Sequence, residues 1–293
     1  MISGCWTALV TPFSAGGAVD ERALRALVDW QIAEGVHGLV PIGSTGEAVT
    51  LSADERDRVV RIVAEQAAGR VPIMAGAGAN DTRQAVANSA AMKDAGATHL
   101  LHVSPMYNKP PQRGIVAHFR AIAEAAGLPV IVYNVPGRTA SNIEAQTTLE
   151  LASIRGIVGI KEASGNLVQI DEIIRRRPAG FSVLSGDDNL TLAVMVAGGD
   201  GIVSVVSNAT PKAMSRLVER AAAKDFDGAR AEHARLAPWM QAAFVESNPI
   251  PAKAALAMLG RIENLLRLPL VPLRPELNGQ VRAALVAAGA LAS

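Results

Sequence analysis

The stretch Ile157-Val158-Gly159-Ile160-Lys161 is a short, uninterrupted run of apolar residues that ends in a lysine. Seven further runs of this kind recur along the chain, and a helical pattern follows each of them. These seven runs lie at residues 6–10, 38–41, 71–75, 99–103, 129–133, 182–185 and 201–204. Because their apolar character is continuous rather than alternating, they are typical of parallel strands that are buried on both faces.

The helical stretches between the predicted strands carry start signals of their own. Ser52-Ala53-Asp54-Glu55 and Ser141-Asn142-Ile143-Glu144 are typical of capping boxes, and Thr210-Pro211 places a cap before a first-turn proline. Eight strand–helix repeats predict a closed α/β barrel, the (β/α)8 TIM barrel. An open doubly wound sheet is the alternative, although such a sheet would rarely need eight regular units.

The predicted barrel accounts for residues 1–224 and leaves residues 225–293. In this last part the apolar spacing predicts helices near residues 225–246, 249–259 and 275–291. These segments are too few and too rich in alanine to predict an independent domain. We therefore interpret them as a C-terminal helical appendage on the barrel.

Composition argues against several classes of partner. The net charge is +1, and the chain has neither a basic block nor a series of aromatic side chains, so nucleic acid is not an expected partner. No apolar stretch reaches the length of a membrane span. Met1-Ile2-Ser3-Gly4 runs directly into the first predicted strand, and the single Cys5, interpreted as a small buried side chain, excludes an internal disulfide framework. Both features favour a cytoplasmic location.

The sequence does not indicate a nucleotide or a metal cofactor. Gly76-Ala77-Gly78 lacks the third glycine of a dinucleotide-binding fingerprint. The five histidines show no paired ligand spacing, and His99 and His102 are expected to point to opposite faces of one strand. Asp187-Asp188 could bind a cation, but capping of the next helix is the favoured interpretation of this pair.

The lysine at the end of the 157–161 run points to amine chemistry. Six of the 28 Lys and Arg residues are lysines, so this chain uses arginine for most of its positive charges. Arginine can neither lose its proton in a protein nor form an imine, whereas a desolvated lysine can do both. Lys161 at a buried strand end therefore predicts a task that needs an amine. The alternative is a solvated cation.

Other polar side chains follow the predicted strands at the same face, where barrel enzymes place their chemistry. The two tyrosines of the chain, Tyr107 and Tyr133, both lie there. Gly43-Ser44-Thr45-Gly46-Glu47 follows the second strand, and its N–H groups and hydroxyls can hold a carboxylate or a phosphate. Taken alone, this loop could equally be an ordinary strand-to-helix turn.

Three motifs, each at a predicted strand end, carry a resemblance to a known family. They are Gly43-Ser44-Thr45-Gly46-Glu47, Tyr133-Asn134-Val135-Pro136-Gly137-Arg138-Thr139 and Gly159-Ile160-Lys161-Glu162-Ala163-Ser164-Gly165. The sequence resembles the dihydrodipicolinate synthase and N-acetylneuraminate lyase family of Schiff-base aldolases. The resemblance covers nearly the whole chain, from Trp6-Thr7-Ala8-Leu9-Val10-Thr11-Pro12 to Leu268-Pro269-Leu270.

The resemblance implies a set of catalytic roles. Lys161 would attack the keto carbon of pyruvate and form an imine, so that no separate cofactor is expected. Tyr133 would move protons beside this imine. Ser44 would link Tyr133 to Tyr107 in a hydroxyl relay, with Tyr107 supplied across a subunit interface. The resemblance implies a homotetramer, built as a dimer of dimers.

The resemblance also implies how the substrates are held. Thr45 and the backbone amides of Ser44 and Thr45 would hold the pyruvate carboxylate, and the backbone at Gly186 and Val203 would line the pocket. Arg138 would bind the carboxylate of L-aspartate 4-semialdehyde, since its planar fork suits a carboxylate. The alternative for Arg138 is a loop salt bridge.

Arg138 distinguishes between the branches of the family. Sialic acid lyases and sugar-acid aldolases generally lack this arginine, so the resemblance implies condensation of pyruvate with L-aspartate 4-semialdehyde, in lysine and diaminopimelate synthesis. Ser44, in place of the commoner threonine, also occurs among the lyases. Another pyruvate-dependent lyase of the family, and a noncatalytic protein that binds small acids, are the alternatives.

Feedback inhibition by lysine is expected to be weak or absent. Relatives that are inhibited by lysine bind it at a dimer interface through polar and aromatic groups. At the corresponding positions this chain has Ala53, Arg56, Gln84 and Met106, and only Asn80 matches well. Without an acidic partner for the amine of lysine, its binding should weaken.

Overall fold

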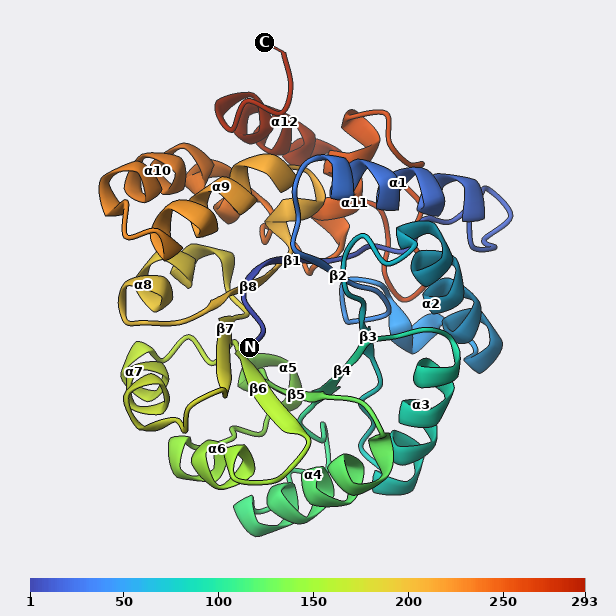
Figure 1. Ribbon diagram of the computed structural model, residues 1–293. Coiled ribbons are helices and arrows are strands. Elements are labelled where there is room, and N and C mark those ends of the chain that lie inside the picture. The colour runs from blue at the N-terminus through green and yellow to red at the C-terminus, as the bar shows by residue number, and fades with distance from the viewer. Residues whose placement is uncertain (293) are drawn as a thin grey trace.

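Eight parallel strands form one ring in the computed structural model, which describes residues 1–292 (Figure 1). The strands are β1 (Gly4–Ala8), β2 (Gly38–Val40), β3 (Met74–Gly76), β4 (His99–Val103), β5 (Val130–Asn134), β6 (Ile157–Glu162), β7 (Ser182–Ser185) and β8 (Gly201–Ser204). Their order is β2-β1-β8-β7-β6-β5-β4-β3, and a parallel bridge between Leu39 and Ile73 closes the ring. The predicted TIM barrel is confirmed.

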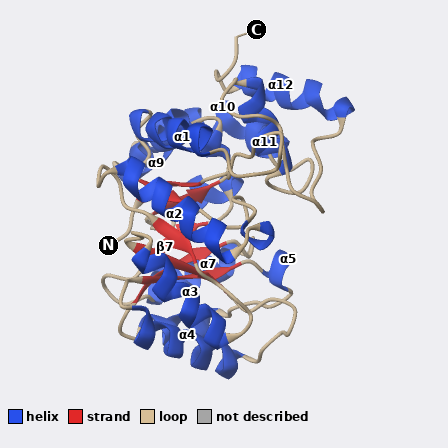
Figure 2. Ribbon diagram, turned by 90° about the vertical axis from the view of Figure 1, so that its right-hand side faces the viewer, coloured by secondary structure: helices blue, strands red, loops and turns tan. Residues whose placement is uncertain are grey.

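A ring of helices surrounds the strands (Figure 1). These helices are α1 (Glu21–Ala33), α2 (Ala53–Ala67), α3 (Thr82–Asp94), α4 (Gln112–Ala126), α6 (Ala145–Ala152), α7 (Leu167–Arg176), α8 (Thr191–Val196) and α9 (Pro211–Ala222). The short α5 (Pro136–Thr139) follows β5 and lies beyond the strand ends instead of in this ring (Figure 2). Short 3-10 turns follow three of the strands: η1 (Ala48–Thr50), η2 (Asp188–Leu190) and η3 (Val206–Asn208).

The strands are buried on both faces, which explains their continuous apolar character. On β5, Ile131 and Tyr133 belong to the apolar cluster inside the ring, whereas Val130 and Val132 pack in the larger cluster under the helices. The inner cluster takes side chains from nearly every strand, including Trp6. The interior is therefore a packed core and not a pore.

The strand boundaries differ from the sequence-based ones by more than one residue at two places. β1 begins at Gly4 and ends at Ala8, instead of spanning residues 6–10, and β3 begins at Met74 rather than at residue 71. Gly4 lies in register with Gly201 of β8, where an added Cβ on Gly201 would lie 2.1 Å from the Gly4 carbonyl oxygen. The strand therefore starts at a close approach of two glycines, which apolar periodicity does not reveal.

The start signals of the helices had three different outcomes. The capping box of α2 is confirmed, with reciprocal hydrogen bonds between Ser52 and Glu55. The box predicted at Ser141 is wrong: α6 begins at Ala145, and the Glu144 N–H donates to the Gln112 side chain. α9 does begin at Pro211, as predicted, but the Thr210 hydroxyl donates to a carbonyl of the preceding turn instead of capping the helix.

The C-terminal segment contains α10 (Phe226–Ala242), α11 (Ile250–Met258), η4 (Pro275–Leu277) and α12 (Asn278–Ala287). These helices gather on one side of the barrel, with α12 farthest from the strands (Figure 2). They share one apolar cluster with α9 and with the strand residues Cys5 and Ile202, and Trp239 in this cluster is fully buried. The domain boundary after residue 224 stays a prediction.

Within the described part of the chain, no helix combines the length and the apolar character needed to cross a membrane.

Candidate active site

The residues singled out by the three motifs lie at the carboxyl ends of the strands or in the loops that follow them. Figure 2 shows α5, which carries Arg138, beyond the strands on the side away from the N-terminus. Lys161 and Tyr133 are neighbours in register on β6 and β5. The two reactive side chains therefore leave adjacent strands at one end of the barrel.

Lys161 is buried, and its amine has no protein partner. Its Nζ lies 4.1 Å from the centre of the Tyr133 ring, and it forms neither a hydrogen bond nor an ion pair with any residue from 1 to 292. Burial lowers the pKa of Lys161 to about 8, against the opposing effect of the Asp188 and Asp187 carboxylates. About a tenth of this amine is consequently uncharged at pH 7, far more than for an exposed lysine. The solvated-cation interpretation of Lys161 is wrong.

A second buried lysine shows why burial alone does not define the nucleophile. Burial also lowers the pKa of Lys253 to about 8. Its Nζ, however, lies 2.5 Å from Glu47 Oε1 and donates to the Leu265 carbonyl at 2.8 Å. The Lys253 amine is occupied, whereas the Lys161 amine is free to react.

Tyr133 can supply a proton beside Lys161. Burial raises the pKa of its phenol to about 12, although the nearby Arg138 guanidinium lowers it. The phenol is therefore protonated at neutral pH and is placed to donate.

Gly186 has no side chain, and Lys161 occupies the space that a side chain at this position would fill. The Gly186 N–H donates to the Glu162 carbonyl at 2.7 Å, which holds the loop after β7 against β6. A Cβ at this position would lie 2.7 Å from the Cβ of Ala163 and 3.1 Å from the Cε of Lys161. Val203 lies inside the ring, in register with Trp6, and is fully buried.

The prediction that Asp188 caps the next helix is wrong. The Asp188 Oδ1 accepts a hydrogen bond from the Ser204 hydroxyl at 2.5 Å, and its Oδ2 accepts from the Val205 N–H at 3.1 Å. Burial raises the pKa of this carboxyl to about 6. Asp188 thus ties the loop after β7 to the end of the neighbouring strand β8.

The 43–47 loop is held tightly on the barrel. The Thr11 hydroxyl donates to the Gly46 carbonyl at 2.7 Å, and a Cβ at Gly46 would lie 2.9 Å from the backbone nitrogen of Ile42. Thr45 is buried, and its hydroxyl accepts a hydrogen bond from Asn248 Nδ2 at 2.9 Å. This loop is an organised element and not only a turn.

Arg138 is exposed and forms no ion pair with any described residue, so the alternative of a loop salt bridge is wrong. Its Nη2 donates to the Asn248 carbonyl at 3.3 Å. The guanidinium lowers the pKa of both Lys161 and Tyr133, which places its charge near the reactive pair. Arg138 can therefore receive an anionic ligand next to Lys161.

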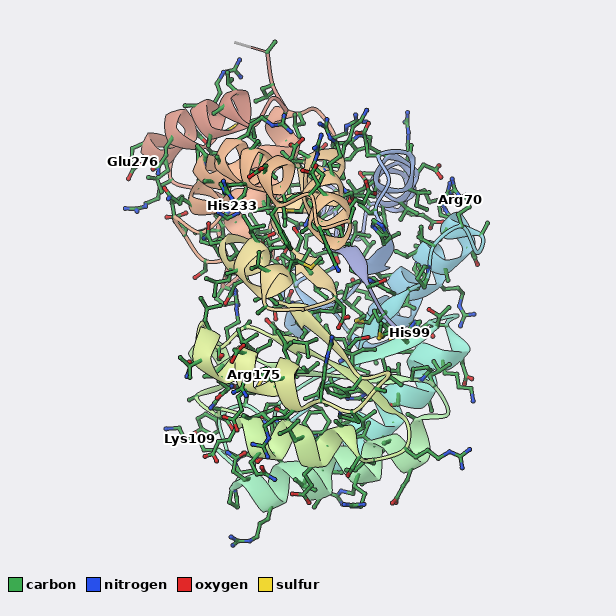
Figure 3. The ribbon with its side chains drawn as sticks, turned by 60° about the vertical axis from the view of Figure 1, so that its left-hand side comes forward. Arg70, His99, Lys109, Arg175, His233 and Glu276 are labelled. Atoms are coloured by element: carbon green, nitrogen blue, oxygen red, sulfur yellow. The ribbon has the colours of Figure 1, made fainter. Side chains whose placement is uncertain are left out.

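The hydroxyl relay is not assembled within a single chain. Ser44 is exposed, and the side-chain hydroxyls of Ser44, Tyr133 and Tyr107 form no hydrogen bonds among residues 1–292. Tyr107 is 89% exposed, and its backbone has a positive φ of 69°. Lys109, two residues farther along this loop, lies at the edge of the molecule (Figure 3). The relay involving Ser44 and Tyr107 stays a prediction.

Sequence reasoning missed the roles of three residues around the 43–47 loop. Glu47 was noted only as the last residue of a motif, and neither Asn248 nor Lys253 was assigned a role. Lys253 is the one charged residue of the otherwise apolar α11, and a lone cation in such a helix is the signal that could have identified it.

The histidines do not gather around a common point. His99 lies edge-on to Trp6, and His102 contacts the Ser89 hydroxyl on the other face of β4. Figure 3 shows His99 and His233 far apart. Residues 1–292 contain no group of three or more His, Cys, Asp or Glu side chains that could hold a metal ion.

The whole chain matches one family. The model of the dihydrodipicolinate synthetase family covers residues 1–288. The chain belongs to the dihydrodipicolinate synthetase family. Curated members include the 4-hydroxy-tetrahydrodipicolinate synthase of Koribacter versatilis, which is 51% identical over 99% of this chain and 97% of its own length.

Two other members extend this likeness. The 4-hydroxy-tetrahydrodipicolinate synthase of Nitratidesulfovibrio vulgaris (strain Miyazaki F) is 50% identical over 98% of each chain. The solved structure of the chloride-inhibited dihydrodipicolinate synthase from Acinetobacter baumannii, complexed with pyruvate, is 43% identical with a TM-score of 0.98. That match covers 99% of this chain and 100% of the other. The family resemblance read from the motifs is confirmed.

Proposed function

We propose that this chain condenses pyruvate with L-aspartate 4-semialdehyde to 4-hydroxy-tetrahydrodipicolinate, in lysine and diaminopimelate biosynthesis. The observation that carries the proposal is the free, buried Lys161 amine beside the Tyr133 ring, 4.1 Å from Nζ to ring centre. The names of relatives at about half identity support the same reaction. Lys161 would act as a Schiff-base lyase residue without a separate cofactor.

The proposed reaction begins with the Lys161 amine. Its lone pair attacks the keto carbon of pyruvate, and loss of one water gives the imine. The imine withdraws electrons, so a methyl proton of pyruvate can leave, and the Tyr133 phenol can return a proton where one is needed. The resulting enamine carbon forms the new carbon–carbon bond with the aldehyde. The amino group of the second substrate can then displace Lys161 and close the ring.

The substrate-binding residues support this order of events. Thr45 and the amides of the 43–47 loop would hold the pyruvate carboxylate, and the backbone at Gly186 and Val203 would line the pocket. Arg138 would bind the carboxylate of the second substrate, since its guanidinium forms no ion pair with any residue from 1 to 292.

Two measurements test the proposal. Incubation with pyruvate and borohydride should add one reduced pyruvate to the peptide that contains Lys161. A noncatalytic acid-binding protein would show no adduct. A coupled assay should then show turnover of L-aspartate 4-semialdehyde in preference to N-acetylneuraminate and keto-deoxy sugar acids, and Arg138→Ala should lower that turnover. Preference for a sugar acid would establish the alternative, another lyase of the family.

We further propose a homotetramer, a dimer of dimers, as the family resemblance implies. The exposure of Tyr107 in the single chain supports an interface at this residue. Light scattering coupled to size exclusion measures the subunit number directly. A cytoplasmic location stays a prediction, which cell fractionation can test.

A further inference from the structure

The C-terminal helical region contacts the 43–47 loop, which would hold the pyruvate carboxylate. Three side chains make this contact, and we refer to them as the clamp: Glu47, Asn248 and Lys253. Lys253 of α11 lies 2.5 Å from Glu47, the last residue of the loop, and Asn248 Nδ2 donates to the Thr45 hydroxyl at 2.9 Å. The loop is thereby joined to residues about 200 positions away in the sequence.

The ion pair of the clamp is completely buried. Both side chains have 0% exposure, and the Lys253 amine also lies 4.0 Å from the centre of the Phe13 ring. The contact with Glu47 Oε1 is an ion pair rather than a well-directed hydrogen bond, while Glu47 Oε2 accepts from the Arg267 N–H at 3.0 Å. A buried ion pair often adds little to stability, so its retention here calls for another explanation.

The geometry of the loop suggests that explanation. Glu47 has a left-handed backbone with φ of 54°, an uncommon conformation for a residue other than glycine. Its backbone follows Thr45 and Gly46 directly, so fixing the Glu47 carboxylate fixes the turn that orients the loop amides. At Thr45, the hydroxyl accepts from Asn248 and can therefore turn its own hydrogen outward to an anion.

We propose that Glu47, Asn248 and Lys253 are positioning residues that orient Thr45 and the loop amides for the pyruvate carboxylate. The proposal rests on the proposed function, because it assumes that this loop binds the keto acid. The clamp does not touch the reacting atoms. Its loss should weaken pyruvate binding while the chemistry at Lys161 and the binding of the second substrate continue.

Two variants test the clamp. Glu47→Gln combined with Lys253→Met removes the ion pair without leaving a lone buried charge. Asn248→Ala removes the hydrogen bond to Thr45. The matched control is Asp200→Asn with Arg177→Met, which removes the part-buried ion pair of Asp200 and Arg177 at the other end of the barrel.

The first readout is the pyruvate concentration that gives half-maximal borohydride-trapped adduct, measured by intact mass. We expect it to rise about tenfold or more in the double variant and about three- to tenfold in Asn248→Ala. The KM for L-aspartate 4-semialdehyde and kcat at saturating pyruvate should stay within about twofold of the wild type. The control variant should leave all three quantities unchanged.

Several results would overturn the proposal. One is a half-maximal pyruvate concentration that does not change in the clamp variants. Another is a control variant in which this concentration rises as much as in the clamp variants. A fall of kcat together with a rise in both the half-maximal pyruvate concentration and the KM for L-aspartate 4-semialdehyde would show a general structural role. Should the double variant fail to fold, the Asn248→Ala result decides alone. If the wild type traps pyruvate yet does not turn over L-aspartate 4-semialdehyde, the proposed function fails, and the trapping measurement still tests the clamp.

Discussion

At the scale of single residues, the reactivity of the Lys161 amine depends on two absences: a carboxylate partner for the amine and a side chain at position 186. Lys161 and Lys253 have the same lowered pKa, about 8, yet only Lys161 is without a carboxylate partner. Gly186 contributes by having no side chain, since a Cβ would contact the lysine stem. The reactivity of the site is thus decided by neighbours as much as by residue type.

The rate of imine formation should rise with pH up to about 8 and then level off. Below its pKa, the uncharged share of the Lys161 amine grows about tenfold for each pH unit. The Asp187 carboxylate raises that pKa, so Asp187→Asn should move the midpoint of the pH profile to lower pH. Asp57→Asn, at a half-buried position on α2, is the control. A midpoint that moves upward in Asp187→Asn would contradict the assignment of the titrating group.

Gly186→Ala should lower kcat strongly while leaving the fold intact. The new methyl group would lie within 3.1 Å of Lys161 Cε and displace the amine. Misplacement of a reacting group by about 1 Å can cost about 10²-fold in rate. Steady-state kinetics and thermal unfolding measure the two effects. Gly279→Ala meets no atom within 4 Å and is the control; an unaffected Gly186→Ala enzyme would refute the steric argument.

At the scale of elements, the ends of helices bring distant parts of the chain together. The N-terminus of α2 carries the confirmed capping box, and its Glu55 also pairs with Arg267 at 2.5 Å. This contact, chiefly, lowers the pKa of Glu55 to about 2. The start of α6, in contrast, has no side-chain cap.

Ser52→Ala and Ser141→Ala should therefore differ in stability. Loss of the Ser52 cap should lower the free energy of unfolding by about 1 kcal/mol. Ser141→Ala removes no cap and should change it by less than about 0.5 kcal/mol. Urea unfolding at a fixed protein concentration measures both. An equal loss in the two variants would mean that Ser141 caps a helix after all.

At the scale of the whole molecule, the site is built from segments that span the chain. The 43–47 loop, the ends of β5 and β6, and residues 248–253 of the C-terminal region meet at one end of the barrel. Tyr107 is 89% exposed, and its hydroxyl forms no hydrogen bond with any residue from 1 to 292. A partner subunit would complete what one chain leaves open.

Mixed oligomers should reveal whether Tyr107 acts in trans. Tyr107→Phe and Lys161→Ala subunits should each have little activity alone. In a mixed pair, the Tyr107→Phe subunit keeps its own Lys161 and receives Tyr107 from its partner, so one site works. Random mixing should restore about a quarter of the wild-type activity. Mixtures no more active than their components would show that Tyr107 serves its own chain or none.

Lysine should inhibit this enzyme weakly or not at all. Ala53, Arg56 and Gln84 offer no carboxylate to the amine of lysine, and Gln84 is engaged with Asn88 at 2.8 Å. The measurement is the initial rate against lysine concentration at fixed substrates. Strong inhibition at micromolar lysine would show this expectation to be wrong.

The sequence by itself determined the barrel and the two reactive strand ends. Continuous apolar runs of strand length need burial on both faces, and eight of them separated by helical patterns leave the closed ring as the favoured solution. Lys161 and Tyr133 were identifiable because their residue types and their places at strand ends are local properties. Local signals were less reliable for capping, since the segment at Ser141 satisfies its backbone groups through Gln112 and Asn134.

Only the tertiary structure decided which buried lysine is free, what Asp188 holds, and how the C-terminal region reaches the 43–47 loop. Each depends on contacts between residues far apart along the chain, such as Lys253 with Glu47 and Asp188 with Ser204. Burial and charge shift a pKa through neighbours in space, and a sequence records only neighbours along the chain.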